Sequence, residues 1–214
     1  IVPEIILTVT ALSVLTLEMA HIFQPRIILI VAALGLLLAG SVVIQTSGDE
    51  QILFGGMLAL NQYSTFFDFL YIFIGLMTLI FSQGYLEKRG VSSRGEYPAL
   101  ILFAVIGMML MTRANDLVIV FLGLELLSLS LYVLVGFLRH DQLSNESGLK
   151  YLLLGAFSTG FFLFGAALTY GATGTTNYNE IVLAIANDTI LSNLYLSRSE
   201  EHTSELQSQL NLVC

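Results

Sequence analysis

The chain alternates between long apolar runs and short polar segments. Its apolar blocks are about 20 residues long, which is the length that a helix needs to cross a hydrocarbon core of about 30 Å. A more polar stretch, 172–197, follows the last block and is expected to be an outer loop with a short amphipathic helix around Ile181–Ile190. The blocks predict six membrane spans: Pro3–Met19, Ile27–Gln45, Phe66–Tyr85, Tyr97–Met111, Leu117–Leu138 and Leu149–Gly171.

Composition agrees with this pattern and excludes several classes of protein. Of the 214 residues, 56% are hydrophobic and 11% are charged, whereas a soluble domain carries about 25% charged residues. We therefore expect an all-α, polytopic transmembrane helix bundle. The sequence has no histidine or cysteine cluster for haem, iron–sulfur or zinc, no phosphate-binding loop and no basic face for nucleic acid.

The basic residues are distributed unevenly between the two sides of the predicted bundle. The segment between the second and third spans carries no base, and the turn between the fourth and fifth carries only Arg113. The positive-inside rule then places the other connecting loops in the cytoplasm and the N-terminus outside. The bases of those cytoplasmic loops and helix ends are Arg26, Lys88, Arg89, Arg94, Arg139 and Lys150.

Glu125 is the leading candidate for chemistry, because it lies within the apolar run Phe121–Phe137. An acidic residue near the middle of a membrane helix costs roughly 2.5–3.5 kcal/mol on insertion scales, so it usually faces a polar partner or a water path. We interpret Glu125 as a proton-path carboxylate. Ser128 and Tyr132 share its helix face and are candidates to extend a hydrogen-bonded path. The alternative is a neutral glutamate that only holds helices together.

Lys150 is a supporting candidate at the start of the sixth predicted span. Its alternative role is that of a lysine that extends from a cytoplasmic helix end to the membrane interface. Glu125 should lie about 20 Å from the cytoplasmic end of its helix, whereas Lys150 lies within about a turn of that end. A direct contact between Glu125 and Lys150 is therefore not expected.

Other polar positions have structural interpretations. Asp116 is expected to cap the fifth helix and to interact favourably with its dipole. Asp68 and Glu18 are expected at the membrane interface rather than on a transport path. The small residues Ala156 and Gly160, four apart in the sixth span, are typical of close helix packing.

The C-terminal segment 198–214 differs from everything before it. Residues Arg198–Ser208 resemble the translation of a common short-read sequencing adapter, and Leu212–Cys214 fit the continuation of that adapter in the same frame. We therefore predict that 198–214 is a sequencing artefact and that 1–197 is the N-terminal, six-helix part of a longer membrane protein. Cys214 then carries no information about redox chemistry.

Several motifs around Glu125 resemble one known family. The chain resembles the N subunit of bacterial respiratory complex I, whose mitochondrial counterpart is NADH dehydrogenase subunit 2, and the resemblance covers 1–197. The motifs are Ala114-Asn115-Asp116-Leu117, Phe121-Leu122-Gly123-Leu124-Glu125-Leu126-Leu127-Ser128-Leu129, Leu134-Val135-Gly136-Phe137, Leu149-Lys150-Tyr151-Leu152-Leu153-Leu154-Gly155-Ala156 and Leu163-Phe164-Gly165.

This resemblance implies an antiporter-like, proton-translocating subunit of NADH:quinone oxidoreductase. Glu125 matches the intramembrane glutamate of the family's fifth helix, and Lys150 matches the basic residue early in its sixth. In the family the glutamate tunes a lysine on a later, broken helix, so a chain without that helix is expected to be inactive alone.

The resemblance also implies where the redox chemistry occurs. NADH, FMN, the iron–sulfur clusters and quinone would be bound by other subunits, with no cofactor and no redox chemistry in this chain. Its partners would be the other membrane-arm subunits and the lipid bilayer, with no nucleic acid. The expected location is a bacterial inner (plasma) membrane, the alternative being the mitochondrial inner membrane.

Two other functions remain open at this point. Multisubunit Na⁺/H⁺ antiporters and membrane-bound hydrogenases contain related subunits with the same glutamate on the fifth helix, so Glu125 does not separate them from complex I. A structural membrane bundle with no transport role is a different class of explanation. Lysines within later spans would argue against a purely structural bundle.

Overall fold

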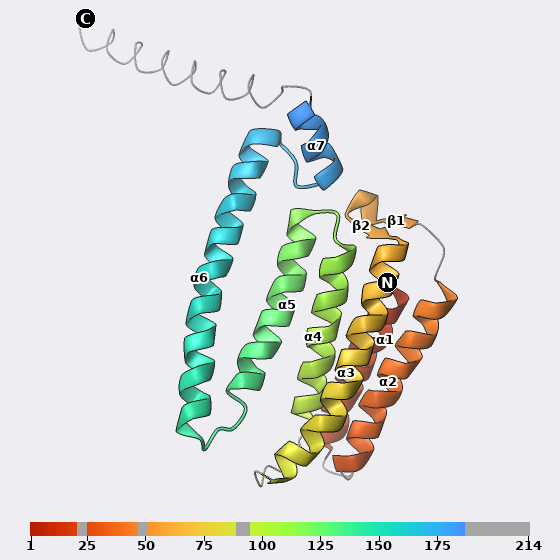
Figure 1. The fold of residues 1–214 in the computed structure, drawn as a ribbon, viewed down its shortest axis with the longest axis vertical. Helices are drawn as coiled ribbons and strands as arrows, with labels where there is room; N and C mark the ends of the chain where they lie inside the picture. The colour runs from red at the N-terminus through yellow and green to blue at the C-terminus, as the bar shows by residue number, and fades with distance from the viewer. Residues whose placement is uncertain (21–24, 47–50, 89–94, 187–214) are drawn as a thin grey trace, which may run out of the picture. The chain divides into compact units, whose positions relative to one another are not determined.

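A computed structural model describes residues 1–20, 25–46, 51–88 and 95–186, and shows six long helices in that part of the chain (Figure 1). All six are long and apolar enough to cross a membrane, so the prediction of an all-α bundle with six spans is confirmed. The predicted artefact 198–214 lies outside the described residues. The helices are α1 (Val2–Met19), α2 (Pro25–Gln45), α3 (Gln62–Lys88), α4 (Glu96–Arg113), α5 (Leu117–Val135) and α6 (Gln142–Thr173).

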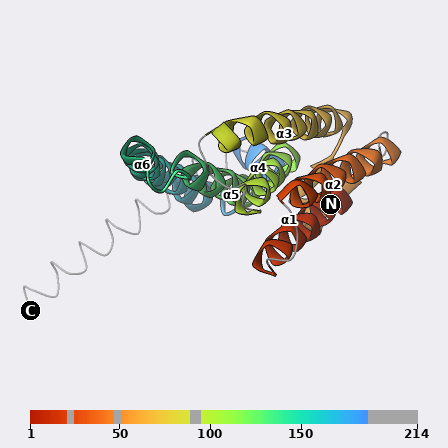
Figure 2. The ribbon, with the colours of Figure 1, turned by 90° about the horizontal axis from the view of Figure 1, so that it is seen from below.

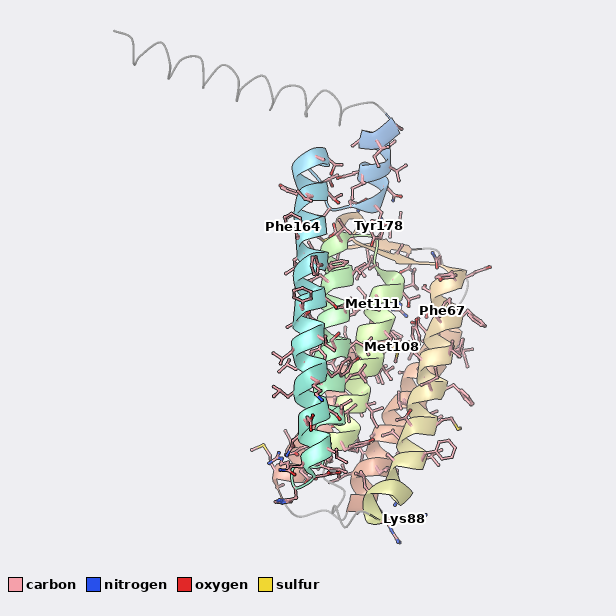
Figure 3. The ribbon with its side chains drawn as sticks, turned by 60° about the vertical axis from the view of Figure 1, so that its left-hand side comes forward. Phe67, Lys88, Met108, Met111, Phe164 and Tyr178 are labelled. Atoms are coloured by element: carbon pink, nitrogen blue, oxygen red, sulfur yellow. The ribbon has the colours of Figure 1, made fainter. Side chains whose placement is uncertain are left out.

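Helix α3 is longer than its hydrophobic run at both ends. It begins at Gln62 rather than at the predicted Phe66, because Asn61 caps it. The Oδ1 atom of Asn61 accepts a hydrogen bond from the backbone N–H of Ser64 at 2.8 Å, and Ser64 Oγ accepts one from the N–H of Asn61 at 3.1 Å. Such reciprocal bonds satisfy the free amides of a first turn. Figure 3 shows Lys88 at the other end of this helix.

Residues 1–160 form one compact unit in which α4 is the central helix. Helices α1, α3 and α5 pack against α4, and α2 packs against α1 and α3 (Figures 1 and 2). A helix that is apolar on all sides is typically buried in this way. The buried positions of α4 are Pro98, Ala99, Ile101, Leu102, Ala104, Val105, Ile106, Gly107, Met109 and Arg113.

Two glycines set the close contact between α4 and α5. A Cβ atom added at Gly107 would lie 2.7 Å from the carbonyl oxygen of Gly123, and one added at Gly123 would lie 2.7 Å from Met111 Cγ. Small residues at such a crossing let two backbones approach closely. Because Gly123 precedes Glu125 by two residues, this contact also fixes the position of Glu125 relative to α4.

A small β-hairpin, which we did not predict from the sequence, lies between α2 and α3 (Figure 1). Strands β1 (Gln51–Leu53) and β2 (Leu58–Leu60) pair antiparallel through the 3-10 turn η1 (Phe54–Gly56). The backbone N–H of Asn115 donates to the carbonyl of Met57 at 2.8 Å. The hairpin is therefore attached to the turn between α4 and α5.

Residues 161–214 form a second compact unit, of which the structure describes 161–186. This part contains the end of α6 and the short helix α7 (Tyr178–Ala186). Thr175 Oγ1 donates a hydrogen bond to Glu180 in the first turn of α7. The short helix expected around Ile181–Ile190 is therefore present but begins earlier, and 187–190 lie outside the described residues.

Candidate functional site

Glu125 lies in the middle of α5, in the apolar part of the bundle, and its side chain is half-buried. The start of α5 is set by Asp116, whose Oδ1 accepts a hydrogen bond from the backbone N–H of Val118 at 2.8 Å. This cap confirms the role predicted for Asp116. The carboxyl of Glu125 thus occupies a defined depth on a helix that is anchored at its first turn and at Gly123.

The direct partner of Glu125 is Thr159, on α6. Thr159 Oγ1 donates a hydrogen bond to Glu125 Oε1 at 2.8 Å. Thr159 lies among the small residues of the sixth predicted span, and its hydroxyl gives no separate signal in the sequence. The structure therefore identifies a hydrogen-bond partner of Glu125 that the sequence pattern missed.

Tyr132 occupies the same interface between α5 and α6. A Cβ atom added at Gly155 would lie 1.7 Å from the Tyr132 hydroxyl oxygen, so the absence of a side chain at Gly155 makes room for this group. The Tyr132 ring packs edge-on against Tyr151, with ring centroids 4.9 Å apart. The predicted hydrogen-bonded path from Glu125 through Ser128 to Tyr132 stays a prediction, although Tyr132 does lie on the expected face.

The sequence predicted that Lys150 lies at the start of its helix. In the structure Lys150 lies eight residues after that start. Helix α6 begins at Gln142 because Asp141 Oδ1 accepts a hydrogen bond from the backbone N–H of Leu143 at 3.0 Å. Lys150 Nζ donates to Glu146 Oε1 at 2.5 Å, and both side chains are exposed. The positive charge of Lys150 is therefore paired within α6.

Glu125 and Lys150 are well separated along the interface. Gly136 and Gly148 meet near the end of α5, since a Cβ atom on Gly148 would lie 2.9 Å from Gly136 Cα. Lys150 follows that contact by two residues, whereas Glu125 precedes it by eleven. At 1.5 Å per residue the two side chains originate about 13 Å apart along the helices. A direct contact was not expected, and none is present.

Asp68 and Glu18 both have partners on other elements, and Asp68 is only 1% exposed. Asp68 accepts a hydrogen bond from Arg113, which also lies 2.5 Å from Glu4. Glu18 accepts a hydrogen bond from the backbone N–H of Gly95 at 2.5 Å, at the positive end of the α4 dipole. The two acids therefore hold helices together, and their position at the membrane interface stays a prediction.

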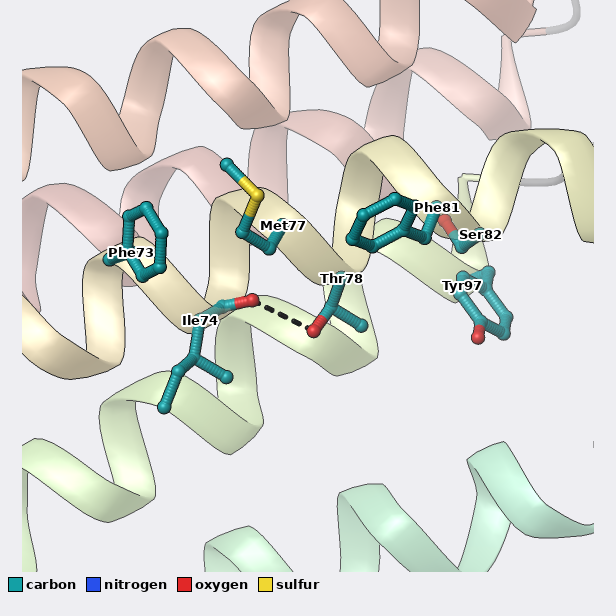
Figure 4. A pocket seen from close by; sticks show the side chains of 7 residues that line it. All are labelled: Phe73, Ile74, Met77, Thr78, Phe81, Ser82 and Tyr97. Atoms are coloured by element: carbon teal, nitrogen blue, oxygen red, sulfur yellow. Dashed lines mark hydrogen bonds between the residues drawn. The ribbon is translucent and has the colours of Figure 1, made fainter.

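An apolar groove between α3 and the start of α4 has a volume of about 410 Å³ (Figure 4). Two of its three hydroxyl groups are already used, because Thr78 donates to the carbonyl of Ile74 and Ser82 to that of Leu79, each at 2.8 Å. Its lining contains no charged group, so we assign no chemistry to it. The lining residues are Phe73, Ile74, Met77, Thr78, Phe81, Ser82 and Tyr97.

Metal chemistry has no visible basis in the part of the chain that the structure describes. No group of three or more histidine, cysteine, aspartate or glutamate side chains is placed there to hold a metal ion. Glu125 with Thr159 is instead a carboxyl with one hydroxyl donor in an apolar setting. Such a pair is suited to taking up and releasing a proton.

Comparison with known families finds a match that includes α5 and α6. Residues 114–201 match the family described as NADH:quinone oxidoreductase/Mrp antiporter, TM. This range contains Glu125, Lys150 and Thr159, and it ends four residues inside the segment 198–214. The proposed artificial origin of that segment therefore stays a prediction.

Curated relatives carry the name of one subunit. The chain is 45% identical over 167 residues to NADH-quinone oxidoreductase subunit N 2 of Roseiflexus castenholzii, covering 78% of this chain and 33% of that protein. It is 40% identical over 185 residues to subunit N of Trichlorobacter lovleyi, covering 85% and 37%. The chain thus spans about a third of the length of the relatives it matches.

Solved structures show the same fold. Respiratory complex I from Thermus thermophilus matches with a TM-score of 0.68 and 34% identity, over 82% of this chain and 38% of that chain. An archaeal membrane-bound sulfane sulfur reductase matches with a TM-score of 0.73 over 89% and 41%, but at 22% identity this likeness concerns the fold alone. Sequence and fold agree, and the chain is similar to part of the N subunits of NADH-quinone oxidoreductase.

Proposed function

We propose that this chain is part of the proton-translocating membrane subunit N of NADH:quinone oxidoreductase and that Glu125 is a proton-binding group on its path. The observation that carries the proposal is the hydrogen bond from Thr159 to Glu125 between two membrane helices. A carboxylate in that position accepts a proton, and the neutral acid later releases it. The free energy for this cycle comes from electron transfer in other subunits.

Lys150 has a supporting role in this proposal. It lies on the cytoplasmic side of Glu125 in the orientation inferred from the basic loops. Its ion pair with Glu146 keeps its ammonium at the exposed surface of α6. The transferable proton therefore resides on Glu125.

The orientation and the location belong to the same proposal. Arg26, Lys88 and Arg139 are exposed in the described residues, whereas Arg113, the base of the opposite side, is buried and paired. The difference in exposed positive charge between the two sides is therefore larger than the sequence indicates. We place the subunit in a bacterial inner membrane with the N-terminus outside.

The partners and cofactors follow from the same assignment. The proton-carrying groups in this chain need no redox cofactor, so NADH, FMN, iron–sulfur clusters and quinone are assigned to neighbouring subunits. The exposed apolar faces of the bundle are covered by lipid, by the remaining helices of the subunit and by other membrane-arm subunits.

The test is Glu125→Gln in the full-length subunit, assembled in the oxidoreductase and reconstituted into liposomes. We expect proton translocation per NADH to fall while assembly of the complex is preserved. The matched control is Glu96→Gln, a partly exposed acid that pairs with Arg139, for which translocation should stay near normal. Unchanged translocation in Glu125→Gln would support a purely structural bundle instead.

The alternative is a subunit of a multisubunit Na⁺/H⁺ antiporter, because the matching family includes such antiporters by its description. Relatives at 45% and 40% identity carry the name of the oxidoreductase subunit, which favours the first assignment. Translocation that requires Na⁺ but not NADH oxidation would favour the antiporter.

A further inference from the structure

A buried charge cluster lies at the end of the bundle where α1 and α3 begin and α4 ends. Glu4, Asp68 and Arg113 are 5%, 1% and 3% exposed. Arg113 Nη1 lies 2.5 Å from Glu4 Oε1, and Arg113 Nη2 donates to Asp68 Oδ2. The cluster joins three helices and has no part in the function proposed for Glu125.

The charges of this cluster do not balance by themselves. Arg113 stays protonated in proteins, and two ionised carboxylates beside it leave one negative charge in excess. An unbalanced charge in a buried site costs several kcal/mol, and the group changes its protonation state instead. One further positive charge is therefore required.

Within residues 1–20, 25–46, 51–88 and 95–186, one candidate for that charge besides a proton lies beside the cluster. The α-amino group of Ile1 lies 3.3 Å from Glu4 Oε2. Among the other packed elements, α2 carries only Arg26, at its opposite end, the β-hairpin carries no charged residue, and Asp116 caps α5. The balance thus rests on the Ile1 amine and the two carboxyls.

One carboxyl oxygen of the cluster has room for a proton. Asp68 Oδ1 is buried without a hydrogen-bond donor, whereas both oxygens of Glu4 are held by ion pairs. An oxygen without a donor loses little when it becomes a hydroxyl, because no donor has to be displaced.

We propose that Glu4 and Asp68, on either side of Arg113, form a second proton-binding site that holds one exchangeable proton. The proton resides on the Ile1 amine or on a carboxyl, and on a carboxyl whenever residue 1 carries no charge. When it leaves, an O–H bond of the acid breaks and the proton passes to water, so the cluster becomes negatively charged and must regain a cation.

The test measures the carbonyl band of protonated carboxylic acids by infrared spectroscopy. The sample is the full chain in liposomes, with an uncharged N-terminal extension that converts the Ile1 nitrogen into an amide. All samples carry Glu125→Gln, so the outcome is independent of the function proposed for Glu125. We expect one acid band that shifts in D₂O.

Single substitutions give a distinctive pattern. Glu4→Gln and Asp68→Asn should each abolish the band, because either change leaves one carboxylate paired with Arg113 and removes the need for a proton. Both variants keep a neutral cluster and should fold. Arg113→Gln should double the intensity of the acid band, and the matched control Asp116→Asn should leave that intensity unchanged.

Three outcomes would overturn the proposal. Absence of an acid band in the extended chain would show that both carboxyls are ionised. A band that survives both Glu4→Gln and Asp68→Asn would belong to another acid. A band that disappears when NaCl replaces choline chloride would show that a metal cation, and not a proton, balances the cluster.

Discussion

Thr159 and Glu125 are joined by a hydrogen bond of 2.8 Å between α6 and α5. The two residues lie 34 positions apart in the sequence, and their pairing depends on the turn that reverses the chain after α5. The hydrogen bond holds the Glu125 carboxyl at the interface of the two helices.

Removal of the Thr159 hydroxyl should weaken the pairing of α5 with α6. Thr159→Ala should lower the free energy of unfolding by about 0.5–1.5 kcal/mol, because it removes one hydrogen bond to Glu125. Thr159→Ser keeps the donor and should keep most of the stability. Unfolding by SDS in mixed micelles checks this. Equal losses for the Ala and Ser variants would contradict it.

Gly155→Ala should destabilise the pairing of α5 with α6, because its methyl group would overlap the Tyr132 hydroxyl. We expect a loss of about 1–3 kcal/mol in the free energy of unfolding. Tyr132→Leu in the same chain should recover part of that loss, giving a non-additive double-mutant cycle. Unfolding by SDS in mixed micelles measures all three variants. Additive effects would show that the two residues do not share the site.

A matched pair of glycine substitutions tests the contact between α4 and α5. Gly107→Ala should cost about 1–3 kcal/mol, because the new methyl group would meet backbone atoms of α5. Gly160→Ala should be neutral or stabilise by up to about 1 kcal/mol, because nothing described lies within 4 Å of it and alanine favours a helix. The same unfolding measurement applies. A larger loss for Gly160→Ala than for Gly107→Ala would refute the assignment of the close contact.

Arg113→Met should destabilise the bundle by about 3–5 kcal/mol, because it leaves Glu4 and Asp68 buried without a guanidinium. Replacing all three residues with apolar ones of similar size should recover most of this loss. The comparison of single and triple variants in the unfolding assay separates the cost of an unpaired charge from that of lost packing. A triple variant as unstable as Arg113→Met would contradict it.

The number of spans and the position of Glu125 followed from hydropathy, because a membrane helix must satisfy its backbone internally over about 20 residues. The helix ends did not follow. Asn61 and Asp141 start α3 and α6 through side-chain caps in polar sequence. A hydropathy profile does not detect such caps. The hairpin was missed because strands of three residues give too little alternation to detect.

Long-range pairs were the other omission. Arg113 contacts Asp68 and Glu4, which lie 45 and 109 positions away, and no local pattern joins them. A signal existed in the predicted topology, since all three charged residues fall at span ends on the same side of the membrane. Thr159 gave no such signal, because one hydroxyl in a small-residue helix is indistinguishable from a packing residue until the register of α5 and α6 is known.

The cluster of Glu4 with Arg113 also bears on how the bundle assembles during synthesis. A ribosome delivers Glu4 to the membrane more than a hundred residues before Arg113, and chains fold from the N-terminal end first. Helices α1 and α3 thus enter the bilayer with acids whose guanidinium partner has not yet been made. The arrival of α4 completes the ion pairs, so insertion of the fourth helix is the step that commits the first four helices to their final arrangement.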